Sequence, residues 1–276
     1  MLVIKLGGGA GNDPGPLLEE LARARPAQAR PAQTRPAQTM ILVHGGSARV
    51  DELSAALGHP PRFLTSPSGY VSRRTDRRTA EIFAMACGDV NRRLVEDLRA
   101  GGVHAFGLSG LDGGLLRAKR KTALRAVDES GRVRVVRDDY TGTVESVDAA
   151  LLELLLGHGL VPVVSPPALS SDGEIVNVDG DRAAAAIAAA LGAETLVLLT
   201  GAPGLLRDPQ DPASRVDRIE RQGLDAARQL ARGRMRIKLR AVEEALDGGV
   251  ARVVIAPSAT GNPLAKALAG EGTVCS

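Results

Sequence analysis

Two hydrophobic patterns alternate along most of this chain. Short runs rich in Val, Leu and Ile are bounded by turn residues, which predicts buried β-strands. Longer segments rich in Ala, Leu, Arg and Glu lie between them and predict helices. The expected strands are Leu2–Leu6, Ile41–His44, Val103–Leu108, Val161–Ser165, Leu196–Thr200 and Arg252–Ala256. The expected helices include Gly46–Leu57, Thr75–Ala100, Val147–Gly157, Gly180–Leu191 and Met235–Leu246.

This order of elements indicates the fold class. Buried strands that alternate with helices form mostly parallel sheets covered on both faces. We therefore predict an α/β fold, a three-layer αβα sandwich with a mostly parallel central sheet and two lobes. A chain of 276 residues is long enough for this. Between Gly113 and Arg137, the polar and apolar residues of 132–137 alternate, which predicts a hairpin-like region.

Residues 25–39 repeat a five-residue unit three times, Arg-Pro-Ala-Gln followed by Ala or Thr. Proline at this period is incompatible with a continuous helix and with a central strand. We predict that the repeat is an expanded, mobile surface loop without a catalytic role.

Composition and charge exclude several classes of protein. The net charge is +3, the basic residues are spread along the chain, and aromatic residues make up 2%. A clustered basic face with stacking aromatics, typical of nucleic-acid binding, is therefore not expected. Cys87 and Cys275 provide neither a disulfide framework nor a metal-ligand spacing. The most apolar stretch, Ala183–Leu191, is too short to span a bilayer. We expect a cytoplasmic protein that binds neither nucleic acid nor membrane.

Lysine is rare in this chain, and one lysine lies beside a glycine-rich turn. Of 35 cationic residues only five are lysines, namely Lys5, Lys119, Lys121, Lys238 and Lys266. Lys5 ends an apolar run and is followed by Gly7, Gly8 and Gly9. Backbone N–H groups of a glycine turn approach an anion closely, and a compact ammonium adds a point charge, so this pairing suits a phosphate group.

Four further segments contain residues that suit a ligand-binding site. His44-Gly45-Gly46-Ser47 is a second glycine turn between a strand and a helix. Neither this turn nor the one after Lys5 matches the dinucleotide-binding or Walker pattern. Asn177–Asp181 precedes an Ala-rich helix, where one Asp or Asn is most often an N-cap. Thr200–Leu205 follows a strand, at the end of a sheet where ligands bind. Gly233–Lys238 opens a helix.

Taken together, these motifs resemble the amino acid kinase family, and in particular the acetylglutamate kinases. The resemblance lies in Lys-Leu-Gly-Gly, Val-His-Gly-Gly, Asn-x-x-x-Asp, Pro-Gly-Leu and Gly-x-Met-x-x-Lys, in that order. A closer resemblance is to the kinases of lysine biosynthesis that act on 2-aminoadipate bound to an amino-group carrier protein. It is found in residues 57–79, 107–113, 120–122 and 139–144.

The resemblance implies roles for individual residues. Residues 1–175 would form an N-terminal lobe that binds the carboxylate substrate and dimerises, and residues 176–276 a C-terminal lobe that binds ATP. The catalytic group would be Lys5, Lys238, Asp181 and Gly8. The substrate would be bound by Gly45, Gly46, Arg73 and Asn177. ATP would be bound by Gly7, Thr200, Gly201, Gly204 and Leu205, although many relatives carry Asp or Asn where this chain has Gly201-Ala202.

The implied reaction fits the residues present. A carboxylate that attacks the γ-phosphorus of ATP is already ionised at neutral pH, so no general base is required. We therefore expect His44 to be structural or to contact substrate. Mg²⁺ would accompany ATP, held by phosphates and water, with no protein ligand named. Arg117, Lys119, Arg120 and Lys121 are either a solvated basic face or the contact for a small acidic carrier protein.

Two other functions remain open at this stage. One is the N-acetyl-L-glutamate 5-kinase activity of arginine biosynthesis, either alone or in addition to the aminoadipate kinase activity. The two substrates differ by one methylene, which changes the binding free energy by only ~1–3 kcal/mol. A non-catalytic nucleotide sensor is the third possibility, which the retention of Lys5 and Lys238 argues against. The chain begins almost at its first strand, without the extra N-terminal helix of arginine-inhibited hexameric relatives, so we expect a homodimer.

Overall fold

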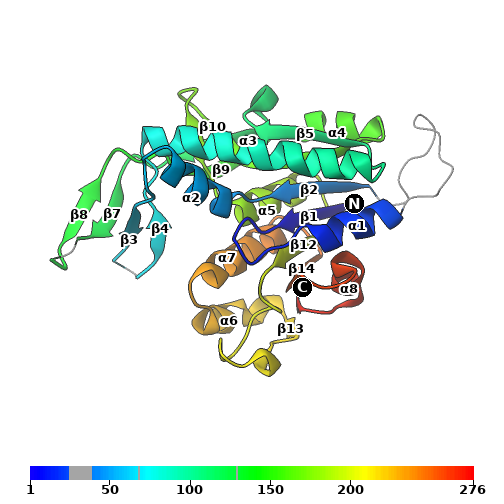
Figure 1. Ribbon diagram of the computed structural model, residues 1–276. Helices are drawn as coiled ribbons and strands as arrows, with labels where there is room; N and C mark the ends of the chain where they lie inside the picture. The colour runs from blue at the N-terminus through cyan, green and yellow to red at the C-terminus, as the bar shows by residue number, and fades with distance from the viewer. Residues whose placement is uncertain (25–38, 68, 129) are drawn as a thin grey trace.

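A computed structural model describes residues 1–24, 39–67, 69–128 and 130–276. The loop prediction for the proline repeat at 25–39 therefore lies outside the described residues, apart from Thr39. Within the described residues the predicted α/β fold is confirmed, with helices on both faces of a large sheet (Figure 1). No helix in these ranges is both long enough and apolar enough to cross a bilayer.

The main sheet contains all six predicted strands. Its order is β13 (Arg218–Ile219), β15 (Thr273–Cys275), β14 (Arg252–Pro257), β12 (Thr195–Thr200), β1 (Leu2–Leu6), β2 (Met40–His44), β10 (Val161–Ser170), β6 (Leu116–Arg120) and β9 (Gly142–Val147). The strands β5 (Ala105–Gly110) and β11 (Ile175–Asn177) also pair with β10. The pairs around β1 are parallel, whereas β14–β15, β6–β9 and β10–β11 are antiparallel.

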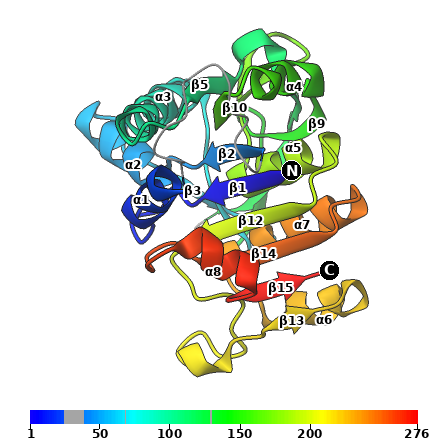
Figure 2. The same cartoon turned by 90° about the vertical axis from the view of Figure 1, so that its right-hand side faces the viewer.

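Each face of the sheet is buried by its own set of helices (Figure 2). One face packs against α1 (Gly15–Arg23), α3 (Arg77–Ala100) and α8 (Pro263–Ala269). The other packs against α4 (Ala149–Gly157), α5 (Gly180–Ala190), α6 (Leu224–Leu230) and α7 (Arg234–Asp247). In β1, Ile4 belongs to the first core and Val3 to the second, because successive side chains point to opposite faces. This explains why the strand is apolar throughout.

The remaining elements lie beside this sandwich. The helix α2 (Ser47–Ala56) packs on α3, and short 3₁₀ turns occur at Asp112–Gly114, Pro212–Ser214 and Arg221–Gly223. A small antiparallel sheet projects from the main body in the order β4 (Val71–Arg73), β3 (Phe63–Thr65), β7 (Leu124–Val127) and β8 (Val133–Val136) (Figure 1). The β7–β8 pair confirms the predicted hairpin.

The topology brings the glycine turns together. Because β1 and β2 are adjacent and parallel, with Leu6 opposite His44, the turns that follow them leave the sheet at the same edge. The helices α2 and α5 begin at this edge as well, and α7 carries Lys238 towards it. The main sheet contains strands from before and after residue 175. The division into lobes at residues 175 and 176 stays a prediction.

Candidate functional site

A cavity of about 1350 Å³ lies at this edge of the sheet. It is lined by the ends of β1 and β2, by the first turns of α2, α5 and α7, and by the projecting sheet. Gly8, Gly46 and Asp181 belong to this lining, as do Arg73 of β4 and Tyr70, which directly precedes β4. A cavity of this size accommodates two ligands of small-molecule size side by side.

Three charged side chains from distant parts of the chain meet in the cavity wall. Lys5 Nζ lies 2.5 Å from Asp181 Oδ1, and Lys238 Nζ lies 2.8 Å from Asp181 Oδ2. All three are 6–7% exposed. Burial alone would raise the pKa of Asp181, but the attraction of the two ammonium groups outweighs it and the pKa is lowered. Burial lowers the pKa of Lys238, against the attraction of Asp181. The group Lys5–Asp181–Lys238 therefore has an excess positive charge that faces the cavity.

Asp179 fixes the backbone that carries Asp181. Its Oδ1 accepts the N–H groups of Asp181 at 3.0 Å and Arg182 at 3.1 Å, so it is the N-cap of α5. Burial, followed by repulsion from Asp181, raises the pKa of Asp179. The structural interpretation of this residue as a cap is thus correct, and the cap also places Asp181 between the two lysines.

The two glycine turns touch each other through their backbones. A Cβ on Gly8 would lie 2.2 Å from the nitrogen of Gly46, so neither turn leaves room for a side chain there. Among the described residues, the N–H groups of Gly8 and Gly46 have no hydrogen-bond acceptor, and both residues line the cavity. They are backbone donors open to an anion, one of them at the N-terminus of α2.

Most of the predicted site residues meet in this cavity. Those that line it are Lys5, Gly7, Gly8, Gly45, Gly46, Arg73, Lys121, Asn177, Asp181, Thr200 and Lys238. Arg73 is ion-paired with Asp51 at 2.6 Å, and Asn177 donates to Thr75 Oγ1 at 3.2 Å. The residues outside the lining are Gly201, Gly204, Leu205, Arg117, Lys119 and Arg120.

The loop after β12 has a clear structural role. Leu205 is 1% exposed, and its N–H donates to Thr273 Oγ1 at 2.8 Å. Gly204 has φ of +145°, and a Cβ there would lie 2.5 Å from the same oxygen. These contacts hold the loop against β15. The contact of Gly201, Gly204 and Leu205 with ATP stays a prediction.

Several polar residues of the cavity lining were not predicted from the sequence, namely Tyr70, Arg182, Arg228, Arg234, Arg236 and Arg240. A signal for two of them was present, since Arg234 and Arg236 lie inside the Gly233–Lys238 motif. The other arginines could not be singled out from the sequence, because arginine is abundant throughout the chain. Their charge makes the cavity a favourable place for anions.

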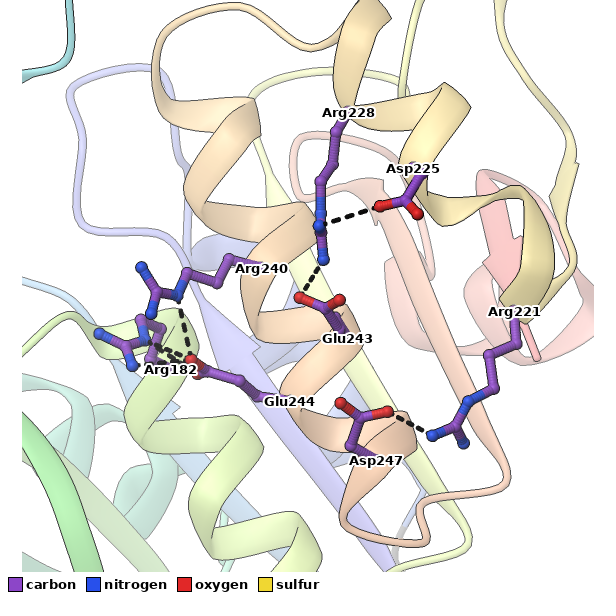
Figure 3. Close-up of polar contacts among 8 residues, drawn as sticks. All are labelled: Arg182, Arg221, Asp225, Arg228, Arg240, Glu243, Glu244 and Asp247. Carbon is purple, nitrogen blue, oxygen red and sulfur yellow. Dashed lines mark hydrogen bonds and ion pairs between the residues drawn. The ribbon is translucent and has the colours of Figure 1, made fainter. Parts of the chain in front are cut away.

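Carboxylates on α7 connect this helix to its neighbours (Figure 3). Glu244 accepts from Arg182 on α5, with Nη2 2.7 Å from Oε1 and Nε 2.8 Å from Oε2, and from Arg240 at 3.2 Å. Glu243 is ion-paired with Arg228 of α6. Because Asp181 is on α5 and Lys238 on α7, the contact of Arg182 with Glu244 sets the distance between the two helices that hold them.

We expect Glu244→Gln to lower the free energy of unfolding by about 1–2 kcal/mol, because two guanidinium groups lose their shared carboxylate. Thermal unfolding measures this as a shift of several degrees. Asp247→Asn is the matched control: Asp247 is on the same helix, but its pair with Arg221 has side chains 58–59% exposed, so a change within about 0.5 kcal/mol is expected. Equal effects of both changes would show that the Glu244 contacts do not hold the helices.

Comparisons with known proteins place this geometry among kinases. Residues 1–257 match the amino acid kinase family. The chain is 50% identical to the LysW-aminoadipate kinase of Deinococcus radiodurans, over 100% of this chain and 91% of that protein. It is 49% identical to the LysW-aminoadipate kinase of Thermus thermophilus, over 99% of both chains. A protein of Cenarchaeum symbiosum named as a putative LysW-aminoadipate/LysW-glutamate kinase is 44% identical, over 84% of this chain and 86% of its own length.

Solved structures have the same fold. N-acetylglutamate synthase from Neisseria gonorrhoeae, complexed with coenzyme A and N-acetyl-glutamate, has a TM-score of 0.74 and 26% identity. The alignment covers 100% of this chain and 59% of that protein. Carbamate kinase from Giardia lamblia bound to AMP-PNP has a TM-score of 0.61 at 14% identity, over 99% of this chain and 97% of that chain, a likeness of fold alone.

Proposed function

The chain belongs to the amino acid kinase family, and we propose that it phosphorylates the side-chain carboxylate of 2-aminoadipate linked to an amino-group carrier protein. It is a phosphotransferase, and ATP is the phosphoryl donor that a kinase of this family requires. The observation that carries the proposal is the Lys5–Asp181–Lys238 group beside the N–H groups of Gly8 and Gly46, which have no acceptor among the described residues. The names of the two relatives at 49–50% identity supply the substrate class.

The site residues support transfer between two bound anions. Lys5 and Lys238 would stabilise the negative charge that spreads over the transferring phosphoryl group, with Asp181 holding both ammonium groups in place. The N–H groups of Gly8 and Gly46 would donate to the same oxygens. Since the attacking carboxylate is ionised at neutral pH, the chain needs only to position it and to offset charge.

We propose that Mg²⁺ accompanies ATP on its phosphate oxygens. The described residues contain no group of three or more His, Cys, Asp or Glu side chains suited to a metal. Both oxygens of Asp181 face lysines, and Asp179 Oδ1 caps α5. The metal would therefore depend on phosphate and water ligands, and it would offset phosphate charge when bound.

An assay with three acceptors tests the function. The purified chain is incubated with ATP, Mg²⁺ and carrier-linked aminoadipate, carrier-linked glutamate or free N-acetyl-L-glutamate, and acyl phosphate is trapped with hydroxylamine. We expect the highest kcat/KM for carrier-linked aminoadipate. Turnover of free N-acetyl-L-glutamate alone would replace the proposed substrate, and no turnover of any acceptor would favour a nucleotide sensor. The expected homodimer stays a prediction.

The basic residues of β6 would contact the carrier protein. Arg117 and Lys119 are exposed and, two residues apart on a strand, point to one side of it. Arg120 has other partners: it donates to Glu174 at 2.7 Å and lies 3.6 Å over the ring of Tyr140. Lys121 lines the cavity. Of the four predicted contact residues, Arg117 and Lys119 are thus the best placed to attract an acidic partner.

We expect the double reversal Arg117→Glu and Lys119→Glu to raise KM for the carrier-linked substrate about tenfold at low salt, because like charges then oppose the partner. The effect is expected to shrink as salt is added. Steady-state kinetics at two ionic strengths measures both. The control is Arg207→Glu with Arg218→Glu, two exposed arginines outside the cavity lining. An unchanged KM in the first variant would exclude this surface.

A further inference from the structure

The buried side chain of His44 has no role in the reaction described above. It ends β2, directly before Gly45, and is 1% exposed. Burial lowers its pKa to about 4, with the charge of Lys5 acting in the same direction against the contact with Gly45. The imidazole is therefore neutral at physiological pH, and its single proton must be on one of the two ring nitrogens.

The neighbours of His44 decide which nitrogen carries this proton. Asn91 Nδ2, on α3, lies 2.8 Å from the carbonyl oxygen of Val163 and 3.0 Å from His44 Nε2. A carbonyl oxygen only accepts, so the Asn91 amide turns its nitrogen towards Val163, and its second hydrogen points to Nε2. Nε2 must then accept. The proton is on Nδ1, which donates to the carbonyl oxygen of Gly45 at 3.1 Å.

This hydrogen bond acts on the Gly45–Gly46 peptide. The oxygen of Gly45 and the N–H of Gly46 belong to one planar peptide group, so a bond that fixes the oxygen also fixes the direction of the N–H. Gly8 packs against one side of this peptide. On another side Cys87 approaches so closely that a Cβ on Gly46 would lie 3.1 Å from its sulfur. The N–H that is fixed in this way lines the cavity and has no acceptor among the described residues.

We propose that His44 and Asn91 are positioning residues, which hold the Gly45–Gly46 peptide so that the Gly46 N–H points at the transferring phosphoryl group. The inference rests on the proposed function. The competing explanation is that the pair only fills the core between β2, β10 and α3. The two explanations differ at Nδ1: positioning requires its hydrogen bond to Gly45, whereas a purely structural role requires only the size of the side chain and the contact of Nε2 with Asn91.

Two substitutions of His44 separate these explanations. In His44→Asn the amide nitrogen takes the place of Nδ1 and can still donate to Gly45. In His44→Gln the amide takes the place of Nε2, so the contact with Asn91 is kept and the donor to Gly45 is lost. Positioning predicts that kcat falls about tenfold to a hundredfold in His44→Gln and less in His44→Asn, with KM for ATP within about threefold of wild type in both.

A purely structural role predicts the reverse order. Glutamine is closer in volume to histidine and keeps the scaffold contact, so His44→Gln would then be both the more stable and the more active variant. Thermal unfolding of both proteins is measured alongside kcat. A His44→Gln variant as active as His44→Asn, or more active, overturns the proposal.

One measurement needs neither a variant nor turnover. Long-range ¹H–¹⁵N NMR of the histidine rings in the wild-type protein at neutral pH reports the tautomer of each imidazole. We expect the proton of His44 on Nδ1, and a proton on Nε2 would overturn the proposed chain of hydrogen bonds. If the tautomer is correct while the wild-type protein phosphorylates none of the three acceptors, the proposed function fails and the hydrogen-bond geometry stands.

Discussion

Replacing either Lys5 or Lys238 by arginine is expected to lower kcat about 10²–10³-fold, while each variant keeps its positive charge. The two ammonium groups share the oxygens of one carboxylate at 2.5 and 2.8 Å, and both side chains are at least nine-tenths buried. A guanidinium is longer and planar, so it cannot occupy the same point in this wall. Steady-state kinetics with carrier-linked aminoadipate measures the loss, which we expect in kcat more than in KM for ATP.

Lys266→Arg is the matched control for the same chemical change. Lys266 is on α8, outside the cavity lining, and is only partly buried. Its substitution is expected to leave kcat within about twofold of wild type. Near-normal turnover of Lys5→Arg and Lys238→Arg together would exclude a catalytic role for the pair.

The central sheet was predictable because its strands are buried on both faces. Leu2–Leu6 and Thr195–Thr200 are apolar over most of their length and neighbour each other, so the hydrophobic pattern alone marks them. The projecting strands Phe63–Thr65 and Val71–Arg73 were not predicted. They are three residues long and pair with each other, and Thr65 of the first strand pairs with Val127 of a hairpin far along the chain. No local pattern records such pairing.

The candidate site was predictable where backbone chemistry requires a particular residue. A Cβ on Gly8 would lie 2.7 Å from the Cα of Gly45, and a Cβ on Gly45 would lie 2.8 Å from the nitrogen of Gly8, so both positions require glycine and the sequence shows it. The resemblance to a family, rather than any spacing, brought Lys238 and Asp181 to the same site. The tertiary partners of Arg120 could not be foreseen, because a basic run on a strand does not reveal which of its side chains is held by Glu174 and Tyr140.

Asp181→Asn is expected to destabilise the protein by about 3–5 kcal/mol, because it removes the only carboxylate in direct contact with the two ammonium groups among the described residues and leaves these groups close to each other. The amide is nearly the size of the carboxylate, so the effect is one of charge. Thermal unfolding at neutral pH measures it as a fall of roughly 10 °C. Asp179→Asn is the control, since this neighbouring buried carboxylate caps α5 and asparagine caps a helix equally well. An equal loss in both variants would show that the charge of Asp181 is not what holds the lysines.

The pH dependence of Asp181→Asn provides a second measurement of the same interaction. Burial lowers the pKa of Lys238 from 10.5, and attraction to Asp181 opposes this shift, so removing the carboxylate is expected to lower the pKa further. Between the folded and unfolded pKa values the unfolded chain binds more protons, and stability therefore rises with pH in that range. Residual kcat is expected to fall over the same range, because transfer requires the charged lysines. A variant whose stability and activity rise together with pH would contradict the assignment of Asp181 as the counter-charge of Lys5 and Lys238.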